Sequence, residues 1–96
     1  MHHASVRRYH VTSAKEVTRL VNEGFVPIIS QAPGFVAYFG VDGGDGTWAS
    51  LSIFETQAQA DESNRLAADF VKKNLASLMK GAPDTTAGDL VCDTTS

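Results

Sequence analysis

The sequence has a single cysteine, no excess of basic residues and no long apolar run, and each shortage excludes a class of protein. Cys92 stands alone among 96 residues, so no disulfide forms within the chain, which suits the reducing cytoplasm. Eight basic residues against eleven acidic ones leave a formal net charge of −3, without the basic stripe that nucleic-acid binding requires. No run approaches the ~20 apolar residues that span a bilayer. We therefore expect a cytoplasmic protein with no nucleic-acid partner and no membrane partner.

Histidine is also scarce, which argues against a metal site. His2, His3 and His10 have no carboxylate or thiol at ligand spacing, so no metal is expected. The glycine-rich run 42–46 resembles a phosphate-binding loop in composition only, because it joins two predicted strands and precedes no helix. We interpret this run as a hairpin turn.

What is present is a single domain, residues 1–96, in which strand and helix patterns alternate. Ser13 to Glu16 and Thr56 to Gln59 are capping boxes, and each opens an apolar stripe of helical spacing. Pro27 predicts a kink beside Gly24 in the first helix. Strand patterns cover residues 5–11, 35–41, 47–54 and 86–92.

The resulting order, β-α-β-β-α-β, is that of an α+β protein with a ferredoxin-like split sheet. The order of strands across such a sheet is 4-1-3-2. Right-handed crossovers place both helices on one face of it.

The hairpin sequence predicts which side chains share a face of the sheet. One predicted face is nearly all apolar and is expected to lie beneath the helices. On this face, the residues expected to pair across the two strands are Val41 with Thr47, Phe39 with Ala49, Ala37 with Leu51 and Phe35 with Ile53. The other face mixes aromatic and hydroxyl side chains: Val36, Tyr38, Trp48, Ser50, Ser52 and Phe54.

This second face predicts a homodimer. Tyr38, Trp48 and Phe54 would each bury ~150–250 Å², and left in water they would form a patch too large for most soluble monomers. A second copy of the chain is the simplest cover, since two-fold dimers are the commonest oligomers. The serines on the same face favour a cavity over a dry contact.

Three stretches give the chain a resemblance to a known group. Residues 22–27 (Asn-Glu-Gly-Phe-Val-Pro), residues 33–35 (Pro-Gly-Phe) with Tyr38, and residues 52–55 (Ser-Ile-Phe-Glu) before an acidic helix resemble the dimeric α/β-barrel superfamily, most of all its antibiotic-biosynthesis-monooxygenase-like group. The resemblance implies a dimeric barrel and no cofactor. It also implies an activity from a wide range, which includes cofactor-free oxygenation of aromatic polyketides, haem degradation, isomerisation and ligand sensing. Haem degradation is disfavoured, because the second helix has no histidine.

Three polar residues are the candidate catalytic groups. His10 is either a general base for a phenol or a solvated histidine at a strand end. Arg8 either clamps a carboxylate or enolate oxygen or pairs with Asp89 on the last strand. Asn64 lies on the second helix, where the resemblance places polar pocket residues, and its alternative is a solvent-facing amide.

The mixed face supplies the candidate substrate-binding residues. Trp48 matches the third-strand tryptophan of the oxygenases, and with Tyr38 it either stacks on a flat substrate or fills the dimer core. Ser50, Ser52 and Phe54 complete the set.

Two functional hypotheses follow from these residues. The first is a cofactor-independent monooxygenase-like enzyme that acts on an aromatic or quinol-like molecule. The second is a non-catalytic dimeric module that binds a small molecule or a protein. A pocket with His10 or Arg8 near Tyr38 or Asn64 would favour the enzyme.

Overall fold

The strand patterns produce one antiparallel sheet, described here from a computed structural model that covers residues 2–94. Its strands are β1 (His3–His10), β2 (Phe35–Asp42), β3 (Thr47–Phe54) and β4 (Asp84–Asp89), in the order β2-β3-β1-β4. This is the predicted ferredoxin-like order, read from the other edge of the sheet. The α+β fold class is therefore confirmed.

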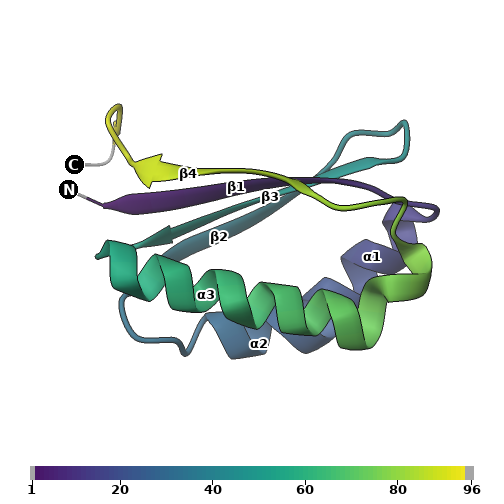
Figure 1. Ribbon diagram of the computed structural model, residues 1–96, viewed down its shortest axis with the longest axis horizontal. Helices are drawn as coiled ribbons and strands as arrows, with labels where there is room; N and C mark the ends of the chain where they lie inside the picture. Colours follow the sequence, from purple (N-terminus) through teal and green to yellow (C-terminus); the bar gives the residue numbers. More distant parts are fainter. Residues whose placement is uncertain (1, 95–96) are drawn as a thin grey trace.

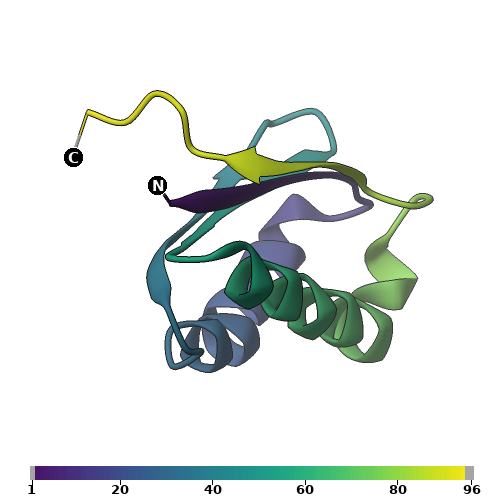
Figure 2. The same ribbon diagram turned by 60° about the vertical axis from the view of Figure 1, so that its left-hand side comes forward.

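Two helical arms cover one face of this sheet (Figures 1 and 2). The first runs through α1 (Ala14–Leu20), a π-helical turn (Val21–Phe25) and α2 (Val26–Ile29). The second runs through α3 (Gln57–Phe70), a π-helical turn (Val71–Leu75) and a 3₁₀ turn (Ala76–Leu78). Within the described residues, no helix is both long and apolar enough to cross a membrane.

Both helical arms begin at the predicted caps. The Thr56 hydroxyl accepts from the Gln59 backbone N–H at 3.2 Å, and the Gln59 side chain accepts from the Thr56 N–H at 3.1 Å. Ser13 likewise accepts from the Glu16 N–H at 3.3 Å, but the Glu16 carboxylate pairs with Arg19. The capping box at Thr56 is therefore complete, whereas at Ser13 only the hydrogen bond to the serine hydroxyl forms.

The irregularity expected at Pro27 is a π-helical turn. Pro27 cannot donate a backbone hydrogen bond, and the five residues before α2 form the wider turn, with Gly24 inside it. A Cβ atom on Gly24 would lie 2.9 Å from Cε1 of Phe70, so the missing side chain lets the two arms approach closely.

The last strand lies earlier in the sequence than expected. β4 pairs only with β1, from Arg8↔Asp84 to His3↔Asp89, so it ends where β1 begins. Leu90 and Val91 therefore fall outside the strand, and Val91 is 78% exposed.

The hairpin register is shifted by two residues from the predicted one. Val41 pairs with Ala49 and Phe39 with Leu51, because the Gly43 N–H bonds to the Thr47 carbonyl at 2.8 Å and extends the ladder. A two-residue shift keeps each side chain on its predicted face. A bulge at the start of β2 is the exception, since it pairs Phe35 with Phe54.

The assignment of the helices to a face was wrong. The helices cover the mixed face, where Trp48, Ser50, Ser52 and Phe54 are all buried. The predicted helix-covered face is open to solvent instead. Large aromatic side chains are needed to fill the space between a sheet and its helices, so the face with more apolar residues is not necessarily the inner one.

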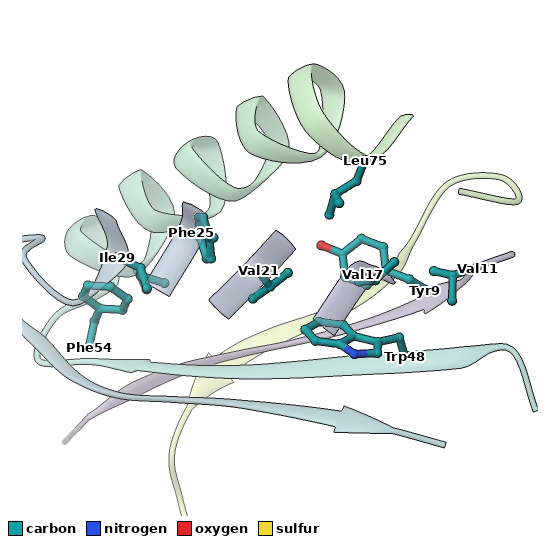
Figure 3. Close-up of a cluster of buried hydrophobic side chains, with 10 residues drawn as sticks. Tyr9, Val11, Val17, Val21, Phe25, Ile29, Trp48, Phe54 and Leu75 are labelled. Carbon is teal, nitrogen blue, oxygen red and sulfur yellow. The ribbon is translucent and has the colours of Figure 1, made fainter. Parts of the chain in front are cut away.

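The core lies between the sheet and the two arms, as Figure 3 shows. Trp48 and Tyr9 project from the sheet near Val17 and Val21 of the first arm, with ring centroids 6.4 Å apart. Phe54 lies at the other end of the core beside Ile29. The core is thus built from the aromatic residues that the sequence had suggested for a dimer contact.

The face away from the helices remains apolar without those aromatics. Val6, Phe39 and Val41 are 43%, 53% and 59% exposed. Leu51 and Ile53 alternate with the buried residues of β3 and are only partly covered. We call these five residues the uncovered face.

Candidate functional site

A small cavity lies between the sheet and the helical arms, and we call it the interior cavity. Its volume of about 20 Å³ has room for about one water molecule. Strands β1, β2 and β3 supply the polar part of its wall, together with α3: Arg7, Tyr9, Tyr38, Trp48, Ser50, Ser52, Ser63 and Asn64. The helical arms supply most of the apolar part, which includes Val21, Phe25, Phe70, Val71 and Leu75.

Strand register explains why polar groups gather there. Arg7 lies opposite Ser50, and Tyr9 lies opposite Trp48, on the helix-covered face of neighbouring strands. Next to them, Ser5 lies opposite Ser52, and no partner for the buried Ser5 hydroxyl is found among the described residues. An unpaired buried hydroxyl destabilises a core, so the presence of one beside Arg7, Ser50 and Ser52 makes this part of the interior the candidate binding site.

Arg7 is the charged residue of the cavity wall. Its Nη2 donates to the backbone carbonyl of Asn64 at 2.9 Å, and its Nη1 contacts the Tyr9 hydroxyl at 3.5 Å. Its Nε is buried and has no partner within residues 2–94. Arg7 is half-buried, and the ion pairs found among the described residues involve other cations, so its contacts within the wall are with neutral oxygen atoms.

Tyr38 is held in its neutral form. Burial raises the pKa of its phenol to about 12, and a hydrogen bond with Ser50 opposes that rise. At neutral pH Tyr38 is therefore a hydrogen-bond donor and has no phenolate to offer as a base. Its ring also packs against Phe25, edge to face, with centroids 5.5 Å apart.

Trp48 is fixed from two sides. Its indole N–H donates to the Thr18 hydroxyl at 3.0 Å, and Thr18 in turn donates to the Ala14 carbonyl at 2.8 Å. On β2, a Cβ on Gly40 would lie 2.8 Å from Cζ2 of the indole, so the glycine makes room for the ring. These contacts set the position of one aromatic wall of the cavity.

A wider groove lies beside the cavity, between the first helical arm and β2. This outer groove has a volume of about 510 Å³, and it extends along Thr18, Asn22, Val26, Ser30, Phe35, Gly40 and Asp42. Val21, Tyr38 and Trp48 line both spaces, so these three side chains form a partition between them. A ligand as large as an aromatic ring reaches the interior cavity only if the partition moves.

The predicted substrate-binding residues are mostly together. Trp48, Tyr38, Ser50 and Ser52 line the interior cavity. Phe54 is fully buried but lies away from the cavity wall, where it packs against Phe35 at a centroid distance of 5.9 Å.

The predicted catalytic residues lie on two different sides of the sheet. Asn64 lines the interior cavity, whereas Arg8 and His10 are exposed on the opposite side of β1. Arg8 pairs with Asp84 at 3.1 Å, which is the predicted link from β1 to β4 but with a different acid from Asp89. The chain does not bring Arg8 or His10 together with Tyr38 or Asn64.

Sequence reasoning missed Arg7 and Tyr9. Side chains alternate along a strand, so assigning the helices to the wrong face also placed Arg8 in the pocket in place of Arg7. The signal that would have found Arg7 is its spacing of two residues from both Ser5 and Tyr9 on β1, which places the three on one face. In the described part of the chain, no three His, Cys, Asp or Glu side chains gather as metal ligands would.

Comparison with known proteins finds solved structures of the same fold. No family model matches the sequence, and the curated proteins contain no match to it. Solved structures do match over nearly the whole chain. A protein of unknown function from Nitrosomonas europaea, NE2512, is 19% identical, with a TM-score of 0.78, over 97% of this chain and 92% of its own.

Two of the similar structures are oxygenases. SnoaB, a cofactor-independent oxygenase from Streptomyces nogalater, is 15% identical, with a TM-score of 0.75, over 99% of this chain and 98% of its own. The ActVA-Orf6 monooxygenase of Streptomyces coelicolor, determined with the ligand nanaomycin D, is 16% identical, with a TM-score of 0.72, over 95% and 92%. At these identities the likeness is one of fold. It confirms the predicted resemblance to the antibiotic-biosynthesis-monooxygenase-like group at that level.

Proposed function

We propose that this protein is a cofactor-independent monooxygenase-like enzyme that acts on a small aromatic or quinol-like molecule. The observation that carries the proposal is the group of polar and aromatic side chains enclosed between the sheet and the helices, where a structural core would be apolar. The fold shared with SnoaB, a cofactor-independent oxygenase, supports the same chemistry.

The proposed chemistry depends on an electron-rich substrate in a space without water. An ionised phenol or hydroquinone gives its electrons to O₂ directly, so one oxygen atom enters the substrate and the other leaves as water. The substrate supplies the electrons and protons for both steps. A dry wall around an ionised ring strengthens the electrostatic interactions that stabilise the charge.

Each cavity residue has a role in this proposal. Trp48 and Tyr38 lie against the faces of the ring, and the neutral Tyr38 phenol donates a hydrogen bond to an oxygen of the substrate. Asn64, Ser50 and Ser52 orient the polar substituents. Arg8 and His10 receive no role, because they lie on the other side of β1.

The substrate would enter the interior cavity from the outer groove through the partition of Val21, Tyr38 and Trp48. The interior cavity is too small for a ring, while the adjoining outer groove is large enough for one. Movement of Tyr38 or Trp48 would join the two spaces. The substrate would then lie across the partition, with its reactive oxygen toward Ser50 and Asn64.

We propose further that the chain is a homodimer through the uncovered face. The exposed apolar side chains share one face of the sheet, where Val6 of β1 and the pair Phe39 and Val41 of β2 flank β3. Covering this face with a second sheet removes apolar surface from water and leaves the interior cavity of each chain intact.

A non-catalytic binding module is the second candidate function. The small volume of the interior cavity, about 20 Å³, favours it, because a protein that only assembles with another protein needs no substrate pocket. Under this alternative, Trp48 and Tyr38 are core residues.

Oxygen uptake tests the proposed activity. The purified protein is mixed with a panel of hydroquinones, naphthohydroquinones and anthrones, and O₂ is followed with an electrode. We expect uptake above the uncatalysed rate, and a loss of at least about tenfold in Trp48→Phe, because the wall that positions the ring is altered. His10→Gln, on the uncovered side of β1, is the control and should keep full activity.

Absence of uptake across the whole panel would favour the binding module. Full activity in Trp48→Phe, with an unchanged thermal midpoint, would remove the interior cavity from the proposal.

A further inference from the structure

The charge in the cavity wall has no acidic counterpart among the described residues. Of the described residues that line the interior cavity, Arg7 alone is charged, and the other titratable groups there are the phenols of Tyr9 and Tyr38. Tyr38 remains neutral, since its pKa is raised to about 12. The Arg7 side chain is half-buried, its Nε is buried without a partner, and no ion pair with an acid is found for it among residues 2–94, so its position carries an electrostatic cost in the empty protein.

The position of Arg7 is fixed before any ligand binds. Nη2 is anchored on the Asn64 carbonyl of α3, and Nη1 faces the Tyr9 hydroxyl. Both contacts are with neutral oxygen atoms, which leave the positive charge uncompensated. A guanidinium held in this way is preorganised for an oxyanion.

We propose that Arg7 selects an aromatic ligand that carries a negatively charged oxygen, and that the bound ligand is its oxyanion form. This inference rests on the proposed ligand site and extends it, since it names the charge of the ligand and the residue that recognises this charge. The oxyanion lies beside the Arg7 guanidinium, and the ring extends across the partition of Val21, Tyr38 and Trp48. Arg7 thus lowers the pKa of a phenol that binds there.

A structural role for Arg7 makes a different prediction. If the side chain only links β1 to α3, its loss lowers stability and affects neutral and charged ligands alike. If Arg7 recognises the charge of the ligand, its loss weakens the binding of the charged ligand alone. The experiment must therefore compare two ligands of the same shape.

4-Nitrophenol and 4-nitroanisole form such a pair. The phenol ionises near neutral pH, and its phenolate has its own visible absorbance, whereas the methyl ether cannot ionise. Affinities are measured by calorimetry, or from the NMR signal of the Trp48 indole N–H. For the wild-type chain we expect the phenolate to bind about ten- to a hundredfold more tightly than the ether, the usual worth of a hydrogen bond to a charged group. The absorbance of the bound phenol should titrate at a lower pH than that of the free phenol.

Variants of two neighbouring arginines distinguish charge recognition by Arg7 from a structural role. Arg7→Met keeps the length of the side chain and removes its charge, so the preference for phenolate should fall to about onefold while the ether still binds. Arg7→Lys should restore part of the preference. Arg8→Gln removes the adjacent charge on the other side of the same strand, where Arg8 pairs with Asp84, and should change nothing.

The possible results are distinct. Equal binding of the two ligands to the wild-type chain, preference retained in Arg7→Met, or no binding of either ligand at millimolar concentration would each overturn the proposal. Preferential binding of the phenolate by a chain that consumes no oxygen would support it and would refute only the oxygenase activity.

Discussion

Single residues set the shape of the cavity wall, and Gly40 of β2 is the clearest example. The ring of Trp48 occupies the space where a side chain at position 40 would stand, with 2.8 Å between the Cβ position and Cζ2. Gly88 of β4 is a second strand glycine, and a Cβ there would meet no atom within 4 Å. Neither residue has a positive φ, so the two differ in the space around them and not in backbone strain.

Replacing each of these glycines with alanine separates packing from backbone entropy. We expect Gly40→Ala to destabilise the fold by about 1–3 kcal/mol, because the methyl group displaces the indole. The emission of Trp48 should change with it. We expect Gly88→Ala to be neutral or to stabilise by up to about 1 kcal/mol through the unfolded state. Urea denaturation followed by far-UV circular dichroism measures both values, and equal effects would show that the Gly40 contact does not constrain the ring.

At the scale of elements, the two helical arms share an irregularity at the cavity. Each arm leaves α-helical geometry for one π-helical turn, Val21–Phe25 in the first and Val71–Leu75 in the second. The first and last residues of both turns line the interior cavity. Wide turns of this kind are frequent at functional sites, where they redirect side chains toward a ligand.

The contact between the arms predicts a coupled pair of substitutions. Gly24→Ala adds helix propensity worth about 1 kcal/mol, but its methyl group meets the Phe70 ring at 2.9 Å, so we expect a net loss of stability. In a Phe70→Leu background the obstruction is smaller, and Gly24→Ala should stabilise. A double-mutant cycle by chemical denaturation measures the coupling, which we expect to exceed about 1 kcal/mol. Additive effects would mean that the arms do not meet at Gly24.

At the scale of the whole molecule, the uncovered face is the feature that a single chain leaves unexplained. Phe39 and Val41, more than half exposed, lie beside the partly covered Leu51 and Ile53. Apolar surface of this kind usually marks an interface. A dimer formed there would bury it and would also stabilise a domain too small to have much stability of its own.

Sedimentation velocity at micromolar concentration tests the dimer. We expect the wild-type chain to sediment as a dimer and Phe39→Asp to sediment as a folded monomer, because a buried unpaired carboxylate is strongly unfavourable. Ile28→Asp is the control, since Ile28 is 50% exposed on α2, away from the sheet face, and should leave the dimer unchanged. A monomeric wild-type chain would refute the proposal.

The sequence by itself determined the element order, the fold class and the content of each sheet face. Capping boxes, hairpin glycines and strand alternation act over a few residues, so they can be read locally. The two-residue error in register left the face sets intact outside the β2 bulge, because the side-chain period of a strand is two; at the bulge, Phe35 packs against Phe54.

Only the tertiary structure decided which face the helices cover, and the candidate site depends on that choice. Arg7 and Arg8 are equally polar in the sequence, yet one lines the interior cavity and the other pairs with Asp84 at the surface. The outcome depends on how well Trp48, Tyr9 and Phe54 fill the space beneath the helical arms. That is a question of volume between elements distant in the sequence, which no local pattern contains.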